Sequence, residues 1–179
     1  MAIYAKGSTS EWEMPPEGLK QAVCSDVVDQ GIREETYEGV TKQKHKVSLS
    51  WELADLQTNG KPFLITKWFT LSLYEQSNLY KSLVSWRKKP FTKKELEAFD
   101  LEKLIGVNCQ LLLQEYAKQD GNLGIKVANI LPADKKHEKL KLSDDYVRVI
   151  DRPDYDEKTP QPEDQVSPVV EEEEDDIPF

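Results

Sequence analysis

Basic and aromatic residues recur together along the first two thirds of the chain. They are Tyr37, Lys42, Lys44, Lys46, Lys67, Trp68, Arg87, Lys88 and Tyr116. Ammonium and guanidinium groups pair with phosphates, and flat rings stack on bases, so this combination is typical of a surface that follows a single-stranded polynucleotide. We therefore expect these residues to contact a single-stranded nucleic acid.

Each of these residues also has an ordinary structural alternative. Lysines are usually solvated surface charges, and a ring such as Tyr37 or Tyr116 could simply pack in its loop or hairpin. Arg87, with Lys88 and Lys89, could interact with the end of a helix instead of a ligand. The sequence leaves these alternatives open.

The alternation of residues 62–70 bears on Trp68 and Lys67. Residues of one parity are apolar: Phe63, Ile65 and Phe69. If they are core, Trp68 faces outward and Lys67 falls on the core side, where it needs a bulge or a strand end to reach solvent. Trp51 and Trp86 share apolar stripes and are expected in the core.

The second candidate site is the acidic segment of residues 171–179. After Glu171–Glu174 it reads Asp175, Asp176, Ile177, Pro178 and Phe179. We expect the ring of Phe179 to fill an apolar pocket on a partner, and its carboxylate to pair with an Arg or Lys. The alternative is a solubilising extension, which has no reason to finish in Ile-Pro-Phe.

The sequence contains few residues whose types and spacing would suit catalysis or metal binding. The cysteines and histidines are too widely spaced for a zinc site: Cys24, His45, Cys109 and His137. The two cysteines are expected as reduced core thiols. There is no Gly-rich phosphate loop or nucleophile–base motif, and paired acids such as Glu34 and Glu35 lie in a predicted polar loop. We expect no enzyme activity, no cofactor and no metal.

Charge divides the chain into a body and a tail. Residues 151–179 hold 12 of the 33 acidic residues and 2 of the 24 basic residues. They also hold five of the ten prolines and few apolar side chains, which favours disorder. We expect a lead-in over 1–18, one folded domain over 19–150 and a disordered acidic tail over 151–179. No apolar run suggests a signal peptide or a membrane span, so the expected location is the cytoplasm.

The sequence pattern of residues 19–150 predicts five strands, with helices only between the third strand and the fourth. The predicted strands are residues 19–29, 45–53, 62–70, 108–116 and 124–131. Gly31 is expected to end the first strand, and residues 31–44 to form a polar loop. Asn59-Gly60 and Asp120-Gly121 predict hairpin turns. Residues 146–150 form a short apolar stretch that could dock on the body.

The helical region carries clear capping signals. Ser77 can cap a helix with one apolar stripe: Leu79, Leu83 and Trp86. Thr92 and Glu95 form a capping box for a second short helix, with Leu96 and Phe99 expected inward. The order β-β-β-α-β-β matches the OB-fold, a five-stranded barrel that binds oligonucleotides, although other small β-barrels could share this order.

Two segments resemble known proteins. The end of the acidic segment looks the same as the C-terminal tip of bacterial single-stranded DNA-binding proteins. The body, over roughly residues 18–132, is similar to single-stranded DNA-binding proteins encoded by bacteriophages. The similar segments are residues 47–53 with Trp51-Glu52-Leu53, 70–73 (TLSL), 85–87 (SWR), and 91–92 (FT) to 99–101 (FDL).

The resemblance implies a phage protein in the host cytoplasm that coats single-stranded DNA in replication and recombination. It further implies that the tip recruits helicases, nucleases, recombination mediators and polymerase components. A homo-oligomer is possible. The alternative is a protein-interaction module that mimics the host tip to divert host repair and replication proteins.

Overall fold

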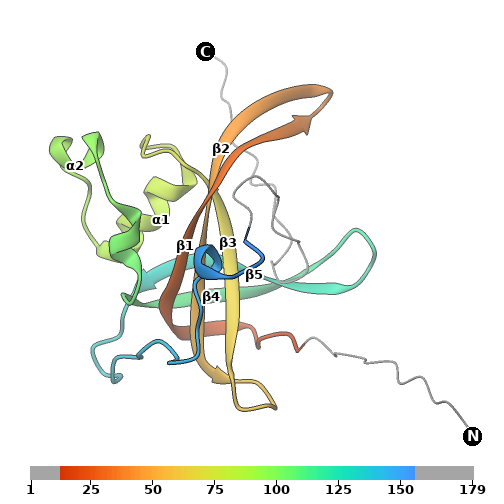
Figure 1. Cartoon of the computed structure of the whole chain (residues 1–179), viewed down its shortest axis with the longest axis vertical. Coiled ribbons are helices and arrows are strands. Elements are labelled where there is room, and N and C mark those ends of the chain that lie inside the picture. The colour runs from red at the N-terminus through yellow and green to blue at the C-terminus, as the bar shows by residue number, and fades with distance from the viewer. Residues whose placement is uncertain (1–12, 156–179) are drawn as a thin grey trace, which may run out of the picture.

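The protein folds as a five-stranded antiparallel sheet with a few short helices, and the computed structural model describes residues 13–155 (Figure 1). The strand order is β3-β2-β1-β4-β5. The strands are β1 Gly18–Tyr37, β2 Val40–Leu56, β3 Pro62–Thr70, β4 Asn108–Ala117 and β5 Leu123–Pro132. The predicted mainly β class and the predicted order of elements are confirmed. The predicted bounds of the last three strands are correct to within one residue. The predicted tail lies outside the described residues from residue 156 onward.

The prediction of a polar loop over residues 31–44 is wrong. This segment belongs to β1 and β2, which continue past the core as a two-stranded ribbon that turns at Glu38 and Gly39, with φ of 48° and 78°. Gly31, expected to end a strand, instead sits at a bulge with a φ of 68°. We call residues 31–46 the arm. Neither face of the arm is covered by the core, so its sequence has no hydrophobic alternation by which to recognise a strand.

The helices between β3 and β4 lie together on the left of Figure 1, away from the tip of the arm. They are α1 Asn78–Arg87, α2 Lys93–Glu97 and a 3-10 turn at Leu101–Leu104. Both predicted caps are present, since Ser77 accepts a hydrogen bond from the amide of Tyr80 and Thr92 forms the capping box with Glu95. Leu96, expected inward, is 38% exposed. Phe99, the other residue expected inward, packs against the core, and its ring lies edge to face on that of Phe91 at 5.0 Å.

The core lies between the inner face of the sheet and α1. Trp51 of β2 is fully buried and packs against Trp86 of α1, with ring centroids 6.3 Å apart. Both tryptophans therefore have the predicted core role. Cys24 and Cys109 are buried and form no disulfide, and burial raises the pKa of the Cys24 thiol to about 12.

The segment 138–152 after β5 docks back on the outer face of β1, as the apolar stretch 146–150 suggested. The fully buried carboxylate of Asp26 accepts hydrogen bonds from the Tyr146 hydroxyl at 3.1 Å, the Arg148 guanidinium at 3.1 Å and the Val149 amide at 2.7 Å. Because a buried carboxylate needs such donors, this contact anchors the segment firmly. Within residues 13–155, no helix is long and apolar enough to cross a membrane.

Candidate nucleic-acid interface

The arm places its three lysines on one face of β2. Lys42, Lys44 and Lys46 alternate along the strand, and antiparallel pairing sets Arg33 opposite Lys44 and Tyr37 opposite Val40. Residues that are paired across antiparallel strands point to the same side of the sheet. Lys42, Lys44 and Lys46 therefore share a side with Arg33 and Tyr37 of β1.

Trp68 of β3 continues this surface toward the body. It pairs with Ser48 of β2, which has the same parity as the three lysines, and its neighbour Thr70 pairs with Lys46. Trp68 thus faces away from the core, as the alternation predicted. We call this surface the basic face, and it consists of Arg33, Tyr37, Lys42, Lys44, Lys46 and Trp68.

The ring of Trp68 is already in contact with a cation. The guanidinium carbon of Arg33 lies 5.7 Å from the ring centroid, and the Arg33 Nε donates to the carbonyl of Gln30 at 2.8 Å. The Trp68 indole nitrogen is buried and has no hydrogen-bond partner among the described residues. A half-buried ring with an adjacent guanidinium can stack on a base while the cation pairs with a phosphate.

Tyr37 stands at the far end of the basic face. It is the last residue of β1 before the turn and is 57% exposed. Cross-strand hydrogen bonds on the other side of the arm stabilise this position: Thr36 Oγ1 lies 2.9 Å from Thr41 Oγ1, and the Gln43 amide donates to Glu34 at 3.3 Å. The ring is therefore held by a strand, not by the loop that the sequence suggested.

One acidic side chain sits among the lysines. Glu35 of β1 accepts from Lys46 Nζ at 2.5 Å through one oxygen and lies 3.4 Å from Lys44 Nζ through the other. Burial raises the pKa of Glu35, but the hydrogen bond and charge of Lys46, together with Lys44, outweigh burial and leave this pKa below its ordinary value. The free protein thus holds Glu35 ionised between two lysines.

Lys67 is not brought to the basic face. It pairs with Leu49 on the core side of the sheet, with neither a bulge nor a strand end to turn it outward. Its ammonium group instead donates to the carbonyl of Val127 on β5 at 3.2 Å and lies 5.2 Å from the ring centroid of Phe69. Lys67 therefore reaches from one edge strand of the sheet to the other.

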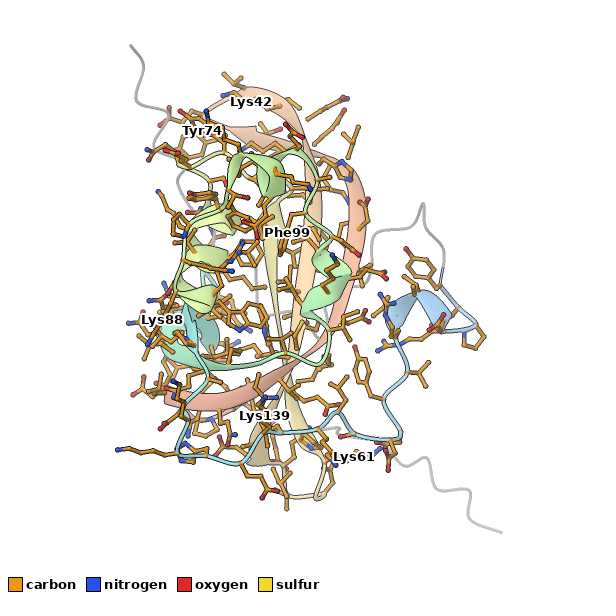
Figure 2. All side chains as sticks on the ribbon, turned by 90° about the vertical axis from the view of Figure 1, so that its left-hand side faces the viewer. Lys42, Lys61, Tyr74, Lys88, Phe99 and Lys139 are labelled. Atoms are coloured by element: carbon orange, nitrogen blue, oxygen red, sulfur yellow. The ribbon has the colours of Figure 1, made fainter. Side chains whose placement is uncertain are left out.

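Arg87 and Lys88 also lie apart from the basic face. Arg87 is engaged within the helical region, where its guanidinium lies 2.7 Å from Glu95 and 4.4 Å from the ring centroid of Phe91. Lys88 caps α1 in a left-handed conformation. Figure 2 shows Lys42 at the top of the molecule and Lys88 well below it on the left. The contacts of Arg87 therefore support the alternative role, in which it interacts with its own helical region and not with a ligand.

Tyr116 belongs to the β4–β5 hairpin, which in Figure 1 extends to the right, below the arm. Its ring lies against Gly124, where a Cβ atom would come within 2.7 Å of the ring. The hydroxyl is buried without a hydrogen-bond partner among the described residues, and burial raises its pKa. Packing over a strand glycine is the role that its contacts show.

Sequence reasoning missed Arg33 and Glu35 as site residues because it lacked the pairing of β1 with β2, which places them beside the lysines. A signal was present, since Glu38-Gly39 has the length and the glycine of a two-residue hairpin turn. Pairing the chain about that turn sets Glu35 opposite Lys42 and Arg33 opposite Lys44. Within the described residues 13–155, no group of three or more His, Cys, Asp or Glu residues could hold a metal ion.

The predicted partner-binding residues, Asp175 to Phe179, lie outside the described residues. Neither a comparison of the chain with protein-family models nor a comparison with curated proteins finds a match.

Proposed function

We propose that this protein binds single-stranded DNA without sequence preference, along the basic face. The observation that carries the proposal is the alignment of Lys42, Lys44 and Lys46 on one side of the arm, in line with Trp68. Alternate strand residues repeat every 6–7 Å or so, which is close to the spacing of phosphates in an extended single strand. A row of cations leading to a ring suits a ligand with a regular backbone and variable bases.

We further propose that the sheet belongs to the OB-type barrels. Support comes from the element order and from the hydrogen bond between Lys67 of β3 and Val127 of β5, which links the two ends of the sheet order. In OB-folds the oligonucleotide crosses strands two and three, between the β1–β2 and β4–β5 loops. The basic face occupies β2, β3 and the β1–β2 hairpin, so its position fits this mode of binding.

The acidic segment of residues 171–179 would recruit replication and repair proteins, and it would compete with DNA for the lysines of the free protein. Support comes from its composition, six consecutive acidic residues followed by Ile-Pro-Phe. Deleting residues 171–179 should raise DNA affinity at low salt and abolish partner binding. An unchanged DNA affinity would contradict the competition.

The decisive experiment is a titration with oligo-dT followed by tryptophan fluorescence at several salt concentrations. We expect quenching, because a base stacks on Trp68, and an affinity that falls linearly with salt on logarithmic axes, because phosphates are neutralised. Absence of binding in dilute buffer would contradict the proposal and favour the protein-interaction module.

A further inference from the structure

The basic face contains a cluster whose geometry is that of an occupied anion site. Two ammonium groups, from Lys44 and Lys46, converge on the two oxygens of Glu35. The hydroxyl of Thr70 on β3 completes the cluster, since it accepts from Lys46 Nζ at 3.2 Å. Three strands thus contribute to one small polar cluster, in which the carboxylate is the single anion.

Glu35 is the acidic residue that strand pairing places on the basic face. The paired strands of the arm contain two acidic residues, Glu34 and Glu35, and of these Glu35 shares the side of the lysines. The side chains of Lys46 and Lys44 are only 12% and 23% exposed, so both ammonium groups are positioned rather than spread into solvent. Two positioned ammonium groups and a hydroxyl can bind the two non-bridging oxygens of a phosphodiester as well as those of a carboxylate.

We propose that Lys44, Lys46 and Thr70 form a phosphodiester subsite, which the carboxylate of Glu35 occupies until a DNA phosphate displaces it. This inference rests on the proposed function and extends it with a competing group inside the folded body. The depressed pKa of Glu35 supports the proposal, because the carboxylate stays ionised and remains a competitor at neutral pH. Breaking the contacts of Glu35 with the two lysines costs free energy, so a polyanion that binds the lysines weakly does not displace Glu35.

The chain offers a matched control for the test. Glu34 is adjacent to Glu35 and carries the same charge, but it faces the other side of the arm, where it accepts from Gln43. The variants Glu35→Gln and Glu34→Gln therefore change the net charge equally, at nearly the same distance from bound DNA. Only Glu35→Gln empties the subsite.

In oligo-dT titrations of the full-length chain, we expect Glu35→Gln to raise affinity about fivefold at low salt and Glu34→Gln less than about twofold. The slope of log affinity against log salt should steepen by about one for Glu35→Gln, because the lysines no longer exchange one anion for another. Glu35→Thr, which also favours a strand, serves as a second variant if Glu35→Gln lowers the melting temperature.

A double-mutant cycle separates displacement from a purely structural ion pair. Lys46→Ala should lower affinity more in the Glu35→Gln background than in the wild type, because the wild-type lysine first loses its contact with Glu35. Equal effects in the two backgrounds, or equal affinities of Glu35→Gln and Glu34→Gln, would overturn the subsite while leaving the proposed function intact. Failure of the wild-type protein to bind oligo-dT would overturn both.

Discussion

The arm and the end of α1 are both basic stretches beside aromatic rings, yet they use their charges in different ways. In the arm, alternation along β2 directs three lysines to one side of the sheet, the side that also carries Glu35 and Trp68. At the end of α1, Arg87 is engaged by Glu95 and covers Phe91. Alternate residues of a strand can therefore present a row of like charges on one side of a sheet, whereas the cation at this helix end is used in local packing.

The strongest predicted loss of DNA affinity tests this contrast directly. Replacing Lys42, Lys44 and Lys46 together with alanine should lower oligo-dT affinity about 100-fold at low salt and flatten the salt slope by about two, because phosphate contacts are lost. Replacing Arg87 and Lys88 with alanine should change affinity less than about twofold. Fluorescence titration measures both, and an equal loss in the two variants would remove the distinction.

The next largest effect concerns the ring that ends the row of lysines. Trp68→Leu should lower affinity about tenfold, because base stacking contributes about 1–3 kcal/mol per base, and it should remove most of the fluorescence quenching. Trp86 belongs to the core and donates to the carbonyl of Asn108 at 3.0 Å. Trp86→Leu should therefore lower the free energy of unfolding while leaving quenching in place, and the reverse pattern would contradict this assignment.

A smaller effect is expected on stability at the helix end. Arg87→Ala should lower the free energy of unfolding by about 1 kcal/mol, because the guanidinium no longer stacks on Phe91. Lys42→Ala in the arm should lower this free energy less, because Lys42 is exposed and surface charge interactions contribute little to stability. Urea denaturation at neutral pH compares the two, and a larger loss for Lys42→Ala would reverse the contrast.

The smallest effect is a pH dependence of the same helix end. Arg87 and the Thr92 amide lower the pKa of Glu95 from 4.5 to about 2. A lowered pKa in the folded state stabilises the protein above the unfolded pKa, and this contribution is lost as the pH falls from about 4.5 toward 2. The difference in melting temperature between wild type and Glu95→Gln should therefore shrink across this range, and a constant difference would show that Glu95 does not act through its charge.

Much of the fold could be predicted because its signals are local. The capping box of Thr92 and Glu95, the stripe of α1 and the alternation of β3 each depend on residues a few positions apart. The outward direction of Trp68 followed from the same alternation. The arm was not predicted, because its two polar strands are stabilised by pairing with each other and not by burial against the core. Neither strand therefore carries the periodic apolar residues by which a strand is recognised in a sequence.

The class and order of the elements follow from the sequence alone, and so does the parity of Lys46 and Trp68 within their strands. Lys42 and Lys44 fell in a predicted loop, so it is the pairing of the strands in the folded protein that puts them on the same surface as Lys46 and Trp68. The contact of Arg33 with Trp68 joins residues from β1 and β3 across β2, and Lys67 is directed to Val127 of β5. Such contacts depend on register and on the curvature of the sheet, because both bring together residues that are distant along the chain.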